Sequence, residues 1–79
     1  MTQVSIQNGA NYETLNIDVT KLTRDMLSIN METTTQEIRR KRFMRALERN
    51  DVVEMVEWAW TESGAKEAMP VFAHKYTME

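Results

Sequence analysis

Apolar and polar residues alternate along the first part of the chain, over residues 3–19 (QVSIQNGANYETLNIDV). A period of two is typical of half-buried strands, because successive side chains of a strand point to opposite faces. The apolar positions of the two alternating segments are Val4, Ile6, Leu15, Ile17 and Val19. Asn8-Gly9 lies between the segments and favours a tight turn, so the sequence predicts a β-hairpin.

The loop length of this hairpin is limited by the register of its strands. A four-residue loop from Asn8 to Asn11 places Val4 opposite Leu15, and a two-residue loop also keeps the apolar side chains on one face. A three-residue loop without a bulge would separate them. We therefore expect a loop of two or four residues. A lone hairpin is marginally stable in water, so its apolar face should pack on the helices that follow.

Two longer helices are predicted in the middle of the chain. Thr34 is followed three positions later by a glutamate, which indicates a capped helix start and a helix over about 35–49. Asp51 is followed by a glutamate at the same spacing and marks the start of a second helix, which should end near residue 62, before Gly64. The short connection between them favours an antiparallel helical hairpin.

The helical pattern is weaker on either side of this pair. Thr20 is the expected N-cap of a short helix that ends near Asn30, with apolar residues at intervals of four and three. After Gly64, the residues that follow Pro70 fit a short helix opened by the proline or a final strand, and we favour the helix.

These elements predict an α+β fold, in which an N-terminal β-hairpin packs on a small helical bundle centred on the antiparallel helical hairpin. The 79 residues are enough for a single compact domain over 1–79. The chain has no cysteine, so stability must come from packing or self-association, and we expect a homodimer. The apolar runs are too short for a membrane span and the N-terminus lacks the features of a signal peptide, so we expect a cytoplasmic protein without a membrane partner.

Charge is divided along the chain. Six of the ten basic residues lie between Arg39 and Arg49, and five of the twelve acidic residues lie between Asp51 and Glu67. The net charge of −2 argues against binding DNA by excess positive charge alone. On a helical wheel, Lys41, Arg42, Arg45 and Arg49 share the arc opposite the apolar one, together with Ile38.

This basic arc has two interpretations. It can contact phosphates or an acidic protein groove. It can equally be solvated or paired with the acids of the next helix, Glu54, Glu57 and Glu62, and we favour this second interpretation over nucleic-acid contact. No aromatic ring for base stacking lies on the arc.

Trp58 lies among the acidic residues of its helix, away from the apolar arc. Either the hairpin or the C-terminal segment covers this indole, or it is an exposed anchor for a protein partner. The candidate partner-binding residues are therefore Arg39, Arg40, Lys41, Arg42, Arg45, Arg49 and Trp58.

Catalytic chemistry is not indicated. His74 is the only histidine, and without cysteine or a second histidine it has no partner for a metal site, so we expect neither metal nor cofactor. Glu54 and Glu57 share one helical face, but that face is polar and should be wet, which does not favour acid–base catalysis. We therefore expect a non-enzyme.

The expected function is that of a small macromolecule-binding protein, a regulator or inhibitor that docks on a protein complex. Compact chains without catalytic groups are common among phage and mobile-element proteins that block host machinery, so a host-directed inhibitor fits this size and style. One alternative is a nucleic-acid-binding regulator that uses helix 39–49. A third is a structural or assembly protein of a larger particle.

Overall fold

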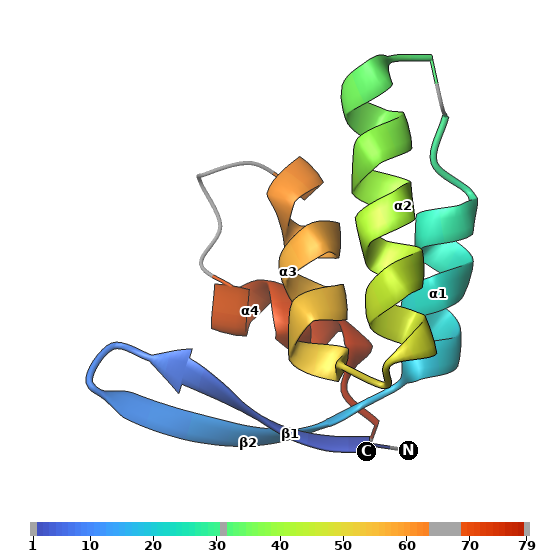
Figure 1. Ribbon diagram of the computed structural model, residues 1–79. Helices are drawn as coiled ribbons and strands as arrows, with labels where there is room; N and C mark the ends of the chain where they lie inside the picture. Colours follow the sequence, from blue (N-terminus) through green and yellow to red (C-terminus); the bar gives the residue numbers. More distant parts are fainter. Residues whose placement is uncertain (1, 31, 64–68, 79) are drawn as a thin grey trace.

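The computed structural model describes residues 2–30, 32–63 and 69–78 (Figure 1). Its elements in chain order are β1 (Thr2–Asn8), β2 (Asn11–Ile17), α1 (Val19–Leu27), α2 (Thr34–Glu48), α3 (Val52–Ser63), α4 (Met69–Ala73) and the 3₁₀ helix η1 (His74–Tyr76). The hairpin lies across one end of the helices, and α2 and α3 run antiparallel beside each other (Figure 1). The predicted α+β fold, a hairpin on a helical bundle centred on a helical hairpin, is confirmed.

The hairpin has the two-residue loop of one predicted alternative and the Val4–Leu15 register of the other. Val4 lies opposite Leu15 and Asn8 opposite Asn11, so the turn consists of the two residues Gly9 and Ala10. Gly9 has a φ of +64°, which glycine adopts without steric cost. A turn centred one residue earlier, on Asn8-Gly9, would place Val4 opposite a glutamate. The observed register instead pairs apolar side chains on the face that packs on the helices.

The core lies between this apolar face and the helices. The most deeply buried side chains come from both strands and from α1, α2 and α3: Ile6, Ile17, Leu22, Met26, Phe43, Met55 and Val56. Phe72 and Tyr76 close the core from the C-terminal segment, with ring centroids 5.3 Å apart. The hairpin therefore does not stand alone; α3, α4 and η1 cover it.

The C-terminal segment forms the short helix that the sequence favours, and the alternative, a final strand, is reduced to one isolated bridge. α4 begins at Met69 and holds Pro70 in its first turn, where a missing N–H costs no helical hydrogen bond. Beyond η1, Thr77 forms a single antiparallel bridge with Ile17 on the outer edge of β2. The N–H of Met78 donates to the carbonyl of Asn16 at 2.9 Å, which anchors the segment there.

The N-cap of α1 differs from the prediction. Asp18 caps the helix, because its Oδ1 accepts from the N–H of Lys21 at 3.0 Å. Thr20 lies inside the first turn. β2 ends at Ile17, so the helix begins as soon as the strand stops, and a carboxylate at the cap also faces the positive end of the helix dipole.

The N-cap of α2 is one residue earlier than predicted. Thr33 Oγ1 accepts from the N–H of Gln36 at 3.2 Å, and the helix starts at Thr34. Thr33 and Gln36 have the same capping-box spacing as Thr34 and Glu37. Thr33 and Thr34 were therefore both possible N-caps, and Thr33 is the one observed.

Three residues connect α2 to α3. Asn50 has a φ of 56°, the left-handed conformation that ends many helices. Its N–H donates to the carbonyl of Leu47 at 3.1 Å, and the N–H of Asp51 donates to that of Ala46 at 2.9 Å. Asp51 then caps α3 by accepting from the N–H of Glu54 at 3.2 Å. The chain thus ends one helix and starts the next without a loose loop.

Candidate partner-binding surface

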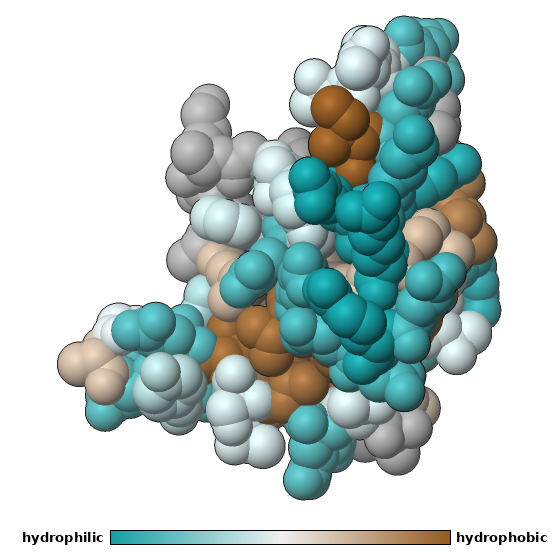
Figure 2. Space-filling model, viewed as in Figure 1, coloured by the Kyte–Doolittle hydropathy of each residue, from teal (hydrophilic) through white to brown (hydrophobic). Residues whose placement is uncertain are grey.

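α2 turns one face to the core and the opposite face to solvent. Phe43 and Ala46 are fully buried. Lys41, Arg42 and Arg45 are exposed, and at about 100° per residue Lys41 and Arg45 lie nearly opposite Phe43 on the helix. Figure 2 shows hydrophilic side chains gathered along α2, with an apolar group in the upper part of the helix.

Arg39 does not belong to this exposed face. Its side chain is 5% exposed and lies between α2 and α3. The guanidinium donates to the carbonyls of Trp58 (2.8 Å) and Ala59 (3.4 Å), to Gln36 Oε1 (2.7 Å) and to Met26 Sδ (3.1 Å). Burial lowers the pKa of the guanidinium from its ordinary value. Arg39 therefore joins the helices and is not presented to a partner.

Arg40 also makes internal contacts, on the other flank of α2. Its Nη2 donates to the carbonyls of Leu27 at 2.8 Å and Ile29 at 3.1 Å, just beyond the last turn of α1. A cation at a helix C-terminus also interacts favourably with the helix dipole. Arg40 is half-buried and holds α1 against α2.

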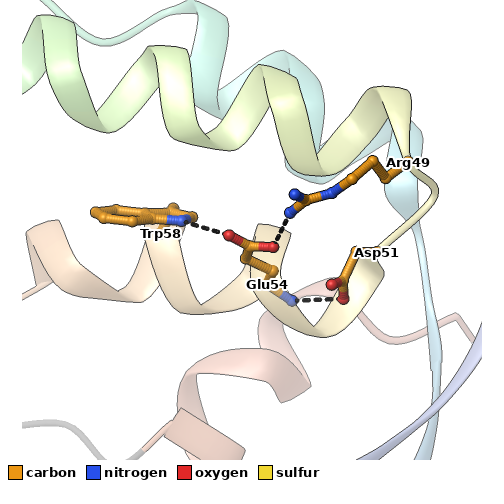
Figure 3. A network of polar contacts seen from close by, with 4 residues as sticks. All are labelled: Arg49, Asp51, Glu54 and Trp58. Carbon is orange, nitrogen blue, oxygen red and sulfur yellow. Dashed lines mark hydrogen bonds and ion pairs between the residues drawn. The ribbon is translucent and has the colours of Figure 1, made fainter.

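Arg49 takes part in a polar network at the junction of α2 and α3 (Figure 3). One carboxylate oxygen of Glu54 accepts from Arg49 Nη2 in an ion pair, and the other accepts from Trp58 Nε1 at 3.3 Å. The predicted charge match between the helices is therefore present for this pair. Glu57 is exposed, and the side chain of Glu62 lies outside the described part of the structure.

Trp58 is neither fully covered nor fully exposed, so it shares features with both predicted roles, a covered indole and an anchor for a protein partner. The indole is half-buried and packs against the core, while its N–H is held by Glu54. Part of the ring remains accessible. The same carboxylate of Glu54 therefore contacts the indole N–H of Trp58 and the guanidinium of Arg49 on α2.

Three of the seven predicted residues remain fully available at the surface. Lys41, Arg42 and Arg45 are exposed, and in the described part of the chain none of them forms an ion pair or hydrogen bond through its side chain. Together with Ile38, which is 48% exposed, they line a shallow hollow of about 140 Å³. We call these four residues the α2 face.

A second hollow lies next to the network of Figure 3, on α3. Its volume is about 410 Å³, and its lining is Glu54, Glu57, Trp58, Trp60, Thr61 and Met69. The two indoles give it apolar walls and the carboxylates give it negative charge. It thus differs in charge from the α2 face, and Glu54, which lines it, pairs with Arg49 of α2.

A third hollow, of about 180 Å³, lies where α1, α3 and the C-terminal segment meet, and sequence reasoning did not find it. Asp25, Arg39 and Tyr76 are its polar lining. Tyr76 is 8% exposed; burial and a hydrogen bond with Asp25 raise its pKa to about 12. The sequence predicted a short helix after Pro70 but no contacts for it, so nothing in the sequence placed Tyr76 beside Asp25.

His74 lies at the surface, where its Nε2 is 2.7 Å from Glu13 Oε1 of β2. Within residues 2–30, 32–63 and 69–78 no cluster of three or more His, Cys, Asp or Glu side chains could hold a metal ion. None of the helices that the structure describes is long and apolar enough to cross a membrane.

No protein-family model, curated protein or solved structure matches this chain. Its function must therefore be argued from its own residues.

Proposed function

We propose that this protein is a small, non-catalytic binding protein that regulates or inhibits a protein complex by docking its α2 face on an acidic surface of that complex. The observation that carries the proposal is the selective exposure of cations on α2. Arg39, Arg40 and Arg49 are used inside the molecule. Lys41 and Arg42, with Arg45, are left to solvent without internal partners in the described structure.

The composition of the face favours a protein over a nucleic acid. Ile38 adds exposed apolar area beside the cations, and arginine is enriched among the residues that contribute most to protein interfaces. The only aromatic ring of α2, Phe43, is fully buried and cannot stack on a base. The net charge of −2 would also repel phosphates from much of the remaining surface.

Trp58 provides a second reason to expect a protein partner. Its indole N–H shares the Glu54 carboxylate with Arg49 of α2, and Trp and Arg are enriched among residues that contribute most to binding. A partner that covers the α2 face and reaches across the Arg49–Glu54 pair would meet this indole. The binding surface then extends over both helices of the hairpin.

Nucleic-acid binding remains the second candidate, because three exposed cations on one side of a helix can contact successive phosphates. This mode makes a different prediction about selectivity. Phosphate contacts weaken uniformly across sequences when a cation is lost, and their salt dependence falls by about one unit of slope per contact. A protein partner would instead be bound selectively.

The test compares the wild type with the double variant Arg42→Ala/Arg45→Ala and with Arg24→Ala as the matched control. Arg24 is an exposed arginine on α1, so its replacement removes a similar charge from another surface. Each variant is used to capture proteins from the native host, and mass spectrometry identifies them. The expected partner is captured by the wild type and by Arg24→Ala but not by the double variant. The purified partner should bind the double variant at least about tenfold more weakly, and Trp58→Ala should also weaken it.

Two results would overturn the proposal. Capture of the same proteins by all variants would show that the α2 face has no role. A salt-sensitive, submicromolar shift of random duplex DNA by the wild type, lost in the folded double variant, would favour the nucleic-acid candidate. Far-ultraviolet circular dichroism of each variant establishes that the fold is intact.

A further inference from the structure

β1 is an edge strand whose outer side is open. Among the residues that the structure describes, the sheet has two strands, and β1 pairs with β2 alone. The outer edge of β2 is partly covered, because Ile17 is bridged by Thr77. Within the described residues, by contrast, no backbone group outside the hairpin bonds to residues 2–8. The turn end of the hairpin also projects beyond the helices (Figure 1).

The register identifies which backbone groups of β1 point outward. In an antiparallel pair, opposed residues alternate between those that exchange hydrogen bonds and those whose N–H and C=O groups point away. The carbonyl of Asn16 accepts from Met78, so Asn16 and the opposed Gln3 belong to the outward set. Ser5 and Gln7 follow at intervals of two. All three side chains are exposed.

β1 also lacks the features with which edge strands usually avoid pairing. Its sequence, TQVSIQN, has no charged residue and no proline, and its pairing with β2 runs without a bulge. Edges of natural sheets are commonly protected by lysine, proline or a bulge. An uncharged, regular edge of seven residues is therefore suited to pair with another strand.

The sequence of β1 is nearly symmetric about Ser5, and this symmetry indicates what the other strand is. Gln3 and Gln7 flank Ser5 at two positions, and Val4 and Ile6 flank it at one. We infer that β1 pairs antiparallel with β1 of a second copy, across a two-fold axis at Ser5. This dimer interface is separate from the α2 face, so it does not depend on the proposed function.

The symmetric register satisfies the outward backbone groups. Ser5 opposes Ser5 of the second copy, and Gln3 opposes the second copy's Gln7, which gives about six hydrogen bonds between the chains. On the inner face, Val4, which is half-buried, lies opposite Ile6 of the second copy. Ile6 is already fully buried, so the apolar surface that the pairing covers is that of Val4 in each copy, and a two-stranded sheet becomes four-stranded.

Sedimentation velocity over low to high micromolar concentrations tests the pairing with charge variants at the axis. Ser5→Lys places like charges opposite each other and should weaken the dimer about tenfold or more, and Ser5→Glu should do the same. An equimolar mixture of these two variants should restore association, which a misfolded variant could not do. Thr14→Lys is the matched control, because Thr14 is exposed and lies directly opposite Ser5 on β2, away from the axis.

Hydrogen exchange gives a second readout. The amides of Gln3, Ser5 and Gln7 should become protected only as the concentration rises, whereas those of Val4 and Ile6 are protected by β2 at all concentrations. A wild type that remains monomeric at high micromolar concentration would refute the inference. So would a dimer that Ser5→Lys leaves intact, or one that Thr14→Lys weakens equally, since either result places the interface elsewhere.

Discussion

Replacing Arg39 with alanine should destabilise the fold severely, although an arginine in a basic run would usually be taken for a surface residue. The substitution removes hydrogen bonds to Gln36 and to the carbonyls of Trp58 and Ala59, and it leaves a gap where the buried stem was. A hydrogen bond from a charged donor contributes about 1.5–3 kcal/mol. Truncation of a long buried side chain costs about 2–5 kcal/mol.

These terms do not simply add. The two carbonyls lie within α3 and retain helical donors, and removal of a buried charge recovers its desolvation cost, which is several kcal/mol. We therefore expect a net loss of about 2–3 kcal/mol in the free energy of unfolding. A domain of this length has about 4–12 kcal/mol in total. The melting temperature should fall by roughly 10–20 °C.

Urea unfolding followed by circular dichroism and tryptophan fluorescence measures this loss. Arg42→Ala is the control on the same helix, and it should change the free energy of unfolding by no more than about 0.5 kcal/mol because Arg42 is exposed. Arg39→Met keeps an apolar stem and removes the donors, so it separates packing from hydrogen bonding. If Arg39→Ala unfolds within about 0.5 kcal/mol of the wild type, the structural role assigned to the guanidinium is wrong.

Three further predictions concern single residues. Because the pKa of Tyr76 is raised from 10.0 to about 12, its contribution to stability should be complete below pH 10 and be lost as the pH rises through about 12. Absorbance titration of the Tyr12→Phe variant, in which Tyr76 is the single tyrosine, measures this pKa, and a midpoint near 10 would contradict it. Asn50→Ala should cost about 1 kcal/mol in thermal unfolding because of its positive φ, whereas Asn50→Gly should be neutral or slightly stabilising; equal effects would argue against the left-handed cap. Asp18→Ala should cost about 1 kcal/mol and Thr20→Ala clearly less, and the reverse order would restore the threonine as the cap of α1.

Much of the fold could be predicted from the sequence, because its local signals agree with one another. The alternation around Val4 and Leu15 defined the hairpin and limited its register. The capping signal at Asp51 separated two helices that share a continuous helical pattern. The errors at Thr20 and Thr34 are shifts among neighbouring capping residues, where side-chain geometry decides between caps of similar strength.

The candidate surface was less predictable. A helical wheel gives the angular position of each side chain on its helix, but not the hydrogen-bond acceptors that a neighbouring helix presents to it. Arg39 was grouped with its basic neighbours, yet it lies on the same face as Phe43 and is buried because carbonyls of α3 face it. The hydrophobic periodicity of α2 contains no information about these carbonyls. The C-terminal segment was harder still, since Tyr76 lies where it does through contacts with α1 and the hairpin, which are distant in sequence.

The bridge between Thr77 and Ile17 also bears on the order in which the molecule can fold during synthesis. The hairpin is synthesised before the helices, but it is covered by α3, by α4 and by the segment around Tyr76, which follow it in the chain. A two-stranded sheet gains little stability before that cover arrives. The hairpin should therefore become ordered only after the segments that follow it have been made, and until then the uncharged strand β1 is open to any nascent chain nearby.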